Sequence, residues 1–326
     1  MLWNRKQKNT AHIEEKFKFL TPKEHEIRSQ RAEQDLEKGQ LPYYIVERLE
    51  RESSSKKENA LPWAATISIN ELMIAKHLGL NVKGMVMGAA HFRLKQITHT
   101  QFTFPETNGY IKYAIAVTED ELIAALTKAY DRLLEEAKLL GADMVVDIKI
   151  KEKYNFHEHD VELYGTAVSI KDTALKQRIL IDNKKIHGTS LSLTELHTSL
   201  QAGLVPNSMY FSVGNVYSHN EYSNYSSFGN MNPNFTNSKQ LEAKIEQSAY
   251  DHALSKLKDI APNTDSYKQH ALFRKPKIHT FKHEYETNSA MKKQHIIVHG
   301  ICILMASLLI EFDPNVKPQI INGVVL

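Results

Sequence analysis

Residues 118–150 read TEDELIAALTKAYDRLLEEAKLLGADMVVDIKI, and this stretch predicts a helix that runs directly into a β-strand. Thr118 and Glu121 have the spacing of a capping box, in which each side chain accepts a hydrogen bond from a free amide at the helix start. Gly141 predicts the helix end, because glycine adopts a left-handed cap at low cost. One apolar stripe runs along the helix at steps of three and four, through Leu122, Leu126, Ala129, Leu133, Ala137 and Leu140.

A β-hairpin follows this helix. Residues 144–150 alternate apolar and more polar side chains, which is the period of a half-buried strand. The polar run 155–160 turns the chain, and residues 161–170 return as the antiparallel neighbour. A long amphipathic helix beside an antiparallel hairpin predicts an α+β fold in which the helix lies on the sheet.

Three segments occur twice in the same order, which predicts an internal duplication. Small changes in their offset are expected where surface loops gain or lose residues. At offsets of 124, 126 and 120 residues, the pairs are Ser68-Ile-Asn-Glu71 with Ser192-Leu-Thr-Glu195, Val86-Met-Gly88 with Ser212-Val-Gly214, and Ala129-Tyr130-Asp131 with Ala249-Tyr250-Asp251.

The second copy is predicted to contain the same elements. Its helix starts near Asn237 or Ser238, and strands over 277–285 and 294–304 form its hairpin. Residues 217–235, rich in Asn, Ser and Tyr, are expected to form a flexible or partner-ordered loop. Each long helix is expected to bury its stripe separately on its own hairpin. The stripe of the second helix is Leu241, Ile245, Ala249, Ala253, Leu257 and Ile260.

The sequence therefore predicts two tandem copies of a helix-on-antiparallel-sheet domain behind a helical segment. The expected parts are a charged helical segment and linker (1–60), the first domain (61–172), a linker (173–189), a diverged second domain (190–312) and a C-terminal tail (313–326).

Composition excludes some classes of function. The formal net charge is +3 and the sequence pI is about 8.6, and the excess of basic residues is spread along the chain. Proteins that track phosphates need a basic stripe, so nucleic-acid binding is not expected. The N-terminus lacks the apolar core of a secretory signal, which predicts a cytoplasmic protein.

The longest apolar stretch, 296–312, contains His299, Gly300, Ser307 and Glu311. It is shorter than a helix needs to span a bilayer, so we expect a buried strand and no integral membrane segment. The only cysteine, Cys302, lies within this stretch and is expected to be a small buried hydrophobe.

Two motifs resemble a known family. Gly141-Ala-Asp143-Met-Val-Val-Asp-Ile and, after the hairpin, Tyr164-Gly-Thr-Ala-Val168 are similar to segments of the YbjQ family, customarily labelled a heavy-metal-binding domain. With Gly39-Gln-Leu-Pro42 upstream, the layout also resembles a longer subfamily with an N-terminal helical region and two tandem domains.

The resemblance implies a dodecin-like antiparallel sheet that carries one long helix, and a ring-like pentameric assembly for single-domain members. It brings no catalytic residues. The second copy departs from the pattern, with Ala261-Pro-Asn263 in place of Gly-Ala-Asp and Gly300-Ile-Cys-Ile303 in place of Gly-Thr-Ala-Val. Equal subunits in a symmetric ring are therefore not expected.

Four histidines of the second hairpin form a candidate metal site. His279 and His283 lie four apart on one strand, and His295 and His299 lie four apart on the other, so each pair projects to one face. A hairpin symmetric about Ser289 would pair His279 with His299 and His283 with His295. Four imidazoles could hold Zn, Ni or Cu. The alternative is a solvated or interface-facing strand in a histidine-rich chain.

Other candidates have structural interpretations. The run His157-Glu-His-Asp160 is predicted to be a polar hairpin tip, and Glu135-Glu136 a solvated helix face. Tyr130-Asp131 and its repeat fit packing and exposed positions of a helix. There is no glycine-rich phosphate loop, no Gly-x-Ser-x-Gly, no His-Glu-x-x-His and no paired cysteine motif, so an enzyme is not expected.

The favoured hypothesis is a non-enzymatic oligomerising scaffold or adaptor that contacts proteins through unprotected sheet edges. Self-association, or binding to other subunits of a larger bacterial assembly such as a secretion or envelope complex, would cover those edges. A metal-binding or metal-sensing protein that uses the strand histidines is the alternative. An enzyme of unrecognised class is the third hypothesis, and it would need a pocket of converging acids and histidines.

Overall fold

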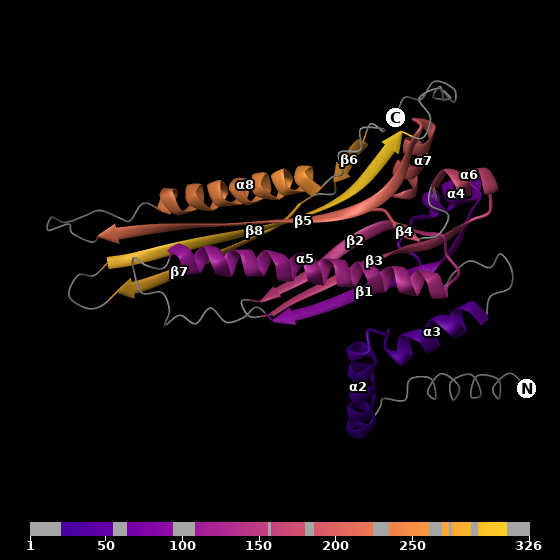
Figure 1. Cartoon of the computed structure of the whole chain (residues 1–326), viewed down its shortest axis with the longest axis horizontal. Coiled ribbons are helices and arrows are strands. Elements are labelled where there is room, and N and C mark those ends of the chain that lie inside the picture. Colours follow the sequence, from indigo (N-terminus) through magenta and orange to yellow (C-terminus); the bar gives the residue numbers. More distant parts are fainter. Residues whose placement is uncertain are drawn as a thin grey trace, which may run out of the picture. The chain divides into compact units, whose positions relative to one another are not determined.

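Figure 1 shows the computed structural model of the chain, which describes residues 21–54, 64–93, 108–155, 158–179, 186–223, 235–260, 269–273, 276–287 and 293–311. The chain forms two compact units, Met1–Ser55 and Lys56–Leu326. The predicted tail after residue 312 lies outside the described residues.

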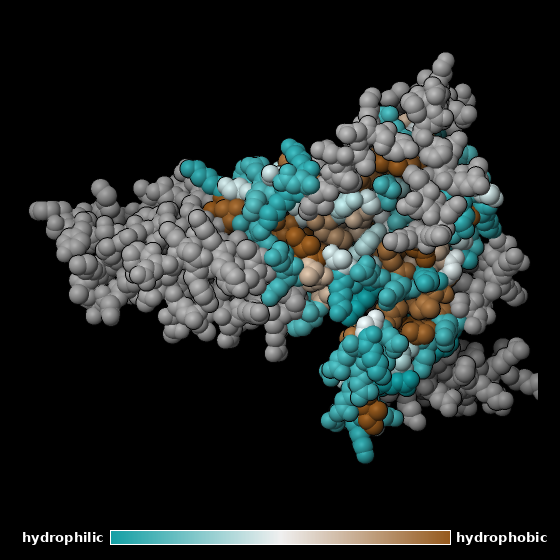
Figure 2. All heavy atoms as spheres, viewed as in Figure 1, coloured by the Kyte–Doolittle hydropathy of each residue, from teal (hydrophilic) through white to brown (hydrophobic). Residues whose placement is uncertain are grey.

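The described residues of the smaller unit form the helices α2 (Pro22–Glu37) and α3 (Tyr43–Ser54). The Tyr43 amide donates a hydrogen bond to the Asp35 carboxylate at 2.9 Å, which ties the start of α3 to the end of α2. Figure 2 shows a mostly hydrophilic surface over α2, as its charged sequence predicts.

The larger unit contains two runs of elements in a similar order. The first run is α4 (Ile69–His77), β1 (Leu80–Arg93), α5 (Asn108–Leu139), β2 (Met144–Asn155) and β3 (Glu158–Ile170). The second is α7 (Leu193–Gln201), β5 (Leu204–Ser223), α8 (Phe235–Ile260), β6 (Gln269–Phe273), β7 (Lys277–Thr287) and β8 (Lys293–Glu311). Between them lie α6 (Thr173–Ile179) and β4 (His187–Gly188). We call residues 64–170 the first half and residues 187–311 the second half.

Each half contributes one sheet. The first has the order β1-β3-β2-β4, in which β3 lies antiparallel to β1 and β2, and β4 lies parallel to β2. In the second, β8 pairs antiparallel with β5 on one side and with β6 and β7 on the other. Thus β5 takes the place of β1, β8 that of β3, and β6 with β7 that of β2. The predicted linker 173–189 contains α6 and β4.

The long helices and the two sheets alternate in layers. Helix α8 packs on β5 and β8, and α5 packs on β1 and β3 and also contacts β5 from the opposite side (Figure 1). The rings of Tyr130 on α5 and Phe211 on β5 meet edge to face, with centroids 5.9 Å apart. Helix α5 therefore lies between the two sheets, and it is covered on both sides.

The predicted apolar stripes are buried at every position whose side chain is described, and the side chains of Leu241 and Ile260 lie outside the described ones. All six positions from Leu122 to Leu140 are at most 6 % exposed, as are Ile245, Ala249, Ala253 and Leu257 of α8. The predicted start of the first helix is wrong, because α5 already begins at Asn108. No proline interrupts residues 108–117, so Thr118 and Glu121 lie inside the helix and cannot cap it.

Glycine allows each long helix to approach its sheet closely. A Cβ atom added to Gly88 would overlap the carbonyl oxygen of Ala129 on α5, and one added to Gly214 would overlap that of Ala249 on α8. Both glycines and both alanines belong to the segments that recur in the sequence. The matching segments therefore make the same backbone contact between strand and helix in the two halves.

The Gly-Ala-Asp turn after α5 has a clear structural role. Gly141 lies in the left-handed region at φ 67°, as predicted. The carboxylate of Asp143 accepts a hydrogen bond from the Ile170 amide at 2.7 Å and pairs with Lys176 at 2.7 Å. Asp143 thus fixes the start of β2 to the end of β3.

The predicted equivalence of Gly165 and Gly300 is wrong. Gly165 lies opposite Val86, two residues before Gly88, whereas Gly300 lies opposite Val216, two residues after Gly214. Small residues recur often enough in strands that a local match does not fix the register.

The two halves also share a hydrophobic core, whose buried members belong to neither helix stripe. One cluster joins strands β1, β2 and β3 to α4, α6, α7 and β8. Its buried members are Ala75, Leu80, Val82, Met144, Val146, Val168, Ile170, Ile179, Leu191, Leu193, Leu196 and Leu309. Because members of both halves bury one another, we expect neither half to be stable without the other.

Candidate functional site

The most elaborate polar arrangement in the described residues is the contact between the two halves, which we call the junction. It consists of α4 and β2 from the first half and of residues 187–191 and α7 from the second. It positions the second half on the open edge of the first sheet.

Backbone hydrogen bonds form the centre of the junction. Residues 187–188 pair with the start of β2, and the Thr189 amide donates to the Val145 carbonyl at 2.8 Å. The Ile148 amide donates to the Thr189 carbonyl at 3.1 Å, and the Asp147 amide to the Leu191 carbonyl at 2.8 Å. The edge of β2 is therefore covered by the segment that leads into α7.

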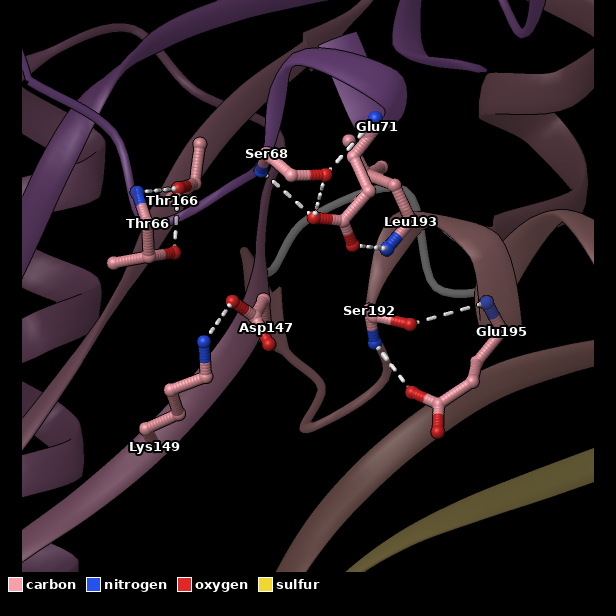
Figure 3. Close-up of polar contacts among 9 residues, drawn as sticks. All are labelled: Thr66, Ser68, Glu71, Asp147, Lys149, Thr166, Ser192, Leu193 and Glu195. Carbon is pink, nitrogen blue, oxygen red and sulfur yellow. Dashed lines mark hydrogen bonds and ion pairs between the residues drawn. The ribbon is translucent and has the colours of Figure 1, made fainter.

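Asp147 is the residue that bends β2 for this contact. It has φ 55°, and the register of β2 against β3 shifts between Val146 and Lys149. Aspartate tolerates the left-handed region better than most residues, and a bulge redirects the backbone amides. The Lys149 ammonium lies 2.7 Å from the carboxylate of Asp147, whose side chain is 5 % exposed (Figure 3). The bulge and this ion pair aim two amides at residues 189–191.

Glu71 connects the helices of the junction. Its carboxylate accepts from the Ser68 amide at 2.8 Å as part of the capping box of α4, and its other oxygen accepts from the Leu193 amide of α7 at 3.2 Å (Figure 3). Ser192 and Glu195 form the same capping box at the start of α7. One carboxylate therefore faces the positive ends of two helix dipoles, which is a favourable placement for negative charge.

A pair of hydroxyl side chains that no sequence motif predicted recurs in the two halves. The Thr66 amide donates to the Thr166 hydroxyl at 2.8 Å, and the two hydroxyls lie 2.8 Å apart. In the second half the Ser190 amide donates to the Ser307 hydroxyl at 2.8 Å, and those hydroxyls also lie 2.8 Å apart. The spacing of 66 to 190 is the one that separates the capping boxes. Thr166 belongs to the family motif, so Ala306-Ser-Leu-Leu309 is its structural counterpart.

Tyr130 joins α5 to the junction. The Gly188 amide donates to its hydroxyl at 2.7 Å, and burial raises the pKa of this phenol to about 12. The residue remains protonated at neutral pH and fixes the position of β4. This agrees with the predicted packing role of Tyr130, while Asp131 is exposed.

Two further acid–base contacts cross between the halves. Glu119 on α5 pairs with Lys256 on α8, and its other oxygen lies 3.6 Å from the His252 ring. Glu152 on β2, whose side chain is 3 % exposed, lies 2.9 Å from Nε2 of His279 on β7. A buried carboxylate is stable only when paired, so His279 has a structural role in this contact.

The register predicted for the histidine hairpin is wrong by two residues. His279 lies opposite Ile301 and His283 opposite Ile297, whereas His299 lies opposite Phe281 and His295 opposite Tyr285. The turn chemistry of residues 286–291 does not determine a register, and the hairpin closes one position later than assumed. The side chains of His283, His295 and His299 lie outside the described ones.

The remaining candidates serve the fold. Glu136, predicted to be solvated, is fully buried and accepts from the Met87 amide at 2.9 Å, which fixes α5 to β1. Cys302 is buried as predicted, and burial raises the pKa of its thiol to about 12. The predicted loop 217–235 contains the end of β5, because the strand continues to Ser223. In the predicted tip 157–160, the Asp160 carboxylate lies 2.5 Å from the His91 ring, and His157 lies outside the described residues.

No group of three or more His, Cys, Asp or Glu side chains within the described ranges could hold a metal ion. None of the helices in the described part of the chain has the length and apolar character needed to cross a membrane. The arrangement is that of an α+β fold whose buried polar groups hold secondary structure together.

Comparison with known families places the first half. Residues 64–171 match the model of the YbjQ family, described as "Putative heavy-metal-binding". The match covers α4 through β3 and includes both resemblance motifs. Searches of curated proteins and of solved structures gave no match.

Proposed function

We propose that this chain is a non-enzymatic, self-associating scaffold built from two tandem YbjQ-like domains, the second of them diverged. The observation that carries the proposal is the junction. It joins unlike surfaces: the β2 edge and α4 of the first half contact the leading segment and α7 of the second.

Recurring local structures support the duplication. Both halves contain the Ser-Glu capping box, the hydroxyl pair and the glycine beneath the long helix. Both also contain a register shift near the start of the first strand, between Val82 and Gly84 in β1 and between Pro206 and Ser208 in β5. The same number of residues separates the two register shifts and the two capping boxes, whereas the two glycines lie two residues further apart. Moving the glycine by two residues along β5 keeps it on the same face of the strand.

A contact between unlike surfaces supports association. When two copies of a domain join head to tail, one head and one tail remain for further contacts, and repetition gives a ring or a filament. In this chain the free head would be the leading segment and α4 of the first half. The free tail would be the edge formed by β6 and β7.

The absence of catalytic function is part of the proposal. The acids Glu71, Glu119, Glu136 and Glu152 face helix starts, a lysine, a backbone amide and a histidine of the fold, respectively. In these contacts the four carboxylates hold parts of the fold together, and no two of them are placed for general acid–base catalysis. Other subunits of a larger bacterial assembly remain part of the proposal as partners.

Light scattering of the purified chain tests the proposal. We expect a mass that is a multiple of the 37.3 kDa chain at micromolar concentration. Affinity purification from the native host should also retain protein partners. A monomer that co-purifies with nothing would contradict the scaffold.

Metal binding is the second candidate function, and two observations favour it. The family description names heavy metals, and His279 lies beside the carboxylate of Glu152 on the strand pair that carries the other three histidines. Imidazole and carboxylate together suit Zn. Metal titration of the native chain and of the variant with His279, His283, His295 and His299 replaced by alanine tests this. Equal stoichiometry in both proteins would remove the candidate.

A further inference from the structure

Helix α4 exposes large apolar side chains on one face. Ile69 is 83 % exposed and Met73 is 65 % exposed. Four residues separate them, so they lie one above the other on the helix. Met85, on β1, is 36 % exposed. Exposed groups of this kind mark an interaction surface more often than isolated apolar residues do.

The corresponding positions of the second half are buried at Leu193 and Met209 and half-buried at His197. At the offset of the capping boxes, Ile69 corresponds to Leu193, which is fully buried in the junction core, and Met85 corresponds to Met209, which is 7 % exposed. Met73 corresponds to His197, whose ring meets the His77 ring of α4 at 5.6 Å. Burial lowers the pKa of His197, and the neighbouring His77 lowers it further. The junction therefore covers on α7 the positions that α4 leaves exposed.

The edge of the second sheet shows the complementary difference. Val146 lies opposite Thr166, and Leu272 lies opposite Ser307. Since Thr166 and Ser307 carry equivalent hydroxyl pairs, Leu272 is the counterpart of Val146. Val146 is fully buried, whereas Leu272 is 44 % exposed. In the described residues β6 and β7 pair only with β8, so this edge lacks the covering segment that β2 has.

The segment before α4 has backbone groups to offer. Ala65 and Ile67 correspond to Thr189 and Leu191, which bond to β2 in the junction. Among the described residues, no hydrogen bond reaches the backbone of Ala65 or Ile67, and Ala65 is exposed. Exposed backbone at a strand-like segment is a ready partner for an open sheet edge.

From these matched differences we infer that a second copy of this chain docks head to tail. Its residues 64–67 and α4 lie on the β6–β7 edge of the first copy, as residues 187–191 and α7 lie on β2. This inference rests on the proposed self-association and adds its two surfaces and its direction. A second copy fits better than an unrelated protein, because the chain already contains both sides of this contact in the junction.

Two variants, each blocking one surface, test the inference. The head variant carries Ile69→Glu and Met73→Glu, and the tail variant carries Leu272→Glu. A buried unpaired carboxylate opposes docking, while the exposed sites in the single chain tolerate charge. We expect light scattering to show a shift from the wild-type mass to the 37.3 kDa monomer for each variant. Mixing the two in equal amounts should restore a dimer, because one intact head and one intact tail remain.

Leu139→Glu is the matched control, since Leu139 is 46 % exposed on α5 and lies outside both surfaces. It should leave the wild-type mass unchanged, and circular dichroism should show all variants folded. An oligomeric wild type whose mass survives both variants would overturn this inference and leave the scaffold standing. A mixture of the head and tail variants that stays monomeric would also overturn this inference. A monomeric wild type would overturn the inference, and a monomer that also co-purifies with no protein would overturn the proposed function as well.

Discussion

The two halves of the larger unit use the same local structures but differ at one edge. In the first half β2 is a continuous strand, bent by Asp147 and covered by residues 187–191. In the second half two strands, β6 and β7, replace it, and Leu272 on that edge is exposed. The comparison teaches that the two halves share the contacts of helix and sheet where the core needs them. They differ at the edges, according to what covers each edge.

The glycines beneath the long helices provide the most severe test of this comparison. Gly88→Ala and Gly214→Ala each place a Cβ in the backbone of the packed helix, so we expect each to lower the free energy of unfolding by about 3 kcal/mol. Denaturant unfolding measures the loss. Gly141→Ala is the control, because nothing lies near its Cβ and only the left-handed φ costs about 1 kcal/mol. Equal losses at Gly141 and Gly88 would refute the packing argument.

The hydroxyl pairs should differ in strength. Ser307 accepts from the Ser190 amide and the Thr189 hydroxyl and is fully buried, so Ser307→Ala leaves buried donors without an acceptor. We expect it to lower the free energy of unfolding by about 2 kcal/mol. Thr166→Ala should cost about 1 kcal/mol, because Thr66 is partly exposed to water. Reversal of this order would show that the two pairs are not equivalent.

Cys302 should make stability depend on alkaline pH. Its folded pKa of about 12 lies above the ordinary value of 9.0, so the folded state keeps a proton that the unfolded state loses. The stability is full below pH 9 and falls as the pH rises toward 12. At pH 10 the loss is about 1.4 kcal/mol. Unfolding of Cys302→Ala at pH 8 and pH 10 should show less of this dependence, and an unchanged slope would contradict the assignment.

The capping boxes give the smallest difference. Glu71→Gln weakens the hydrogen bonds from the Ser68 and Leu193 amides, at the starts of α4 and α7. Glu195→Gln weakens only the bond from the Ser192 amide at the start of α7. We expect Glu71→Gln to lower the free energy of unfolding by about 1 kcal/mol and Glu195→Gln to lower it by about half as much, as measured by thermal unfolding. Identical losses would indicate that the bond from Leu193 to Glu71 contributes nothing.

The sequence predicted what depends on local periodicity and recurrence. The apolar stripes, the cap at Gly141 and the β2–β3 hairpin follow from spacing within one element. The start of α5 did not, because a Thr-Glu spacing occurs inside helices as well as at their ends. Strand β6 was missed because five residues carry too little pattern, and the β7–β8 register depends on a turn without distinctive residues.

The contacts between the halves could not be predicted. The shared core, the Glu71–Leu193 bond and the Ser190–Ser307 pair join residues more than 100 positions apart, and no local pattern specifies them. Thr66 and Ser190 lie two residues before matching capping serines, so an alignment of the two halves could have found the hydroxyl pairs. The side chains that complete the candidate histidine site lie outside the described ones, and that prediction remains a prediction.

Disulfide trapping tests the head-to-tail arrangement most directly. Ala65 corresponds to Thr189, and Ala271 to Val145, the two residues joined by a backbone bond in the junction. In a Cys302→Ala background, the chain with Ala65→Cys and Ala271→Cys is oxidised and run on a non-reducing gel. Head-to-tail docking predicts a ladder of bands at multiples of the mass of one chain. Each single-cysteine variant should give no band larger than a dimer. A product that remains one chain long would contradict it.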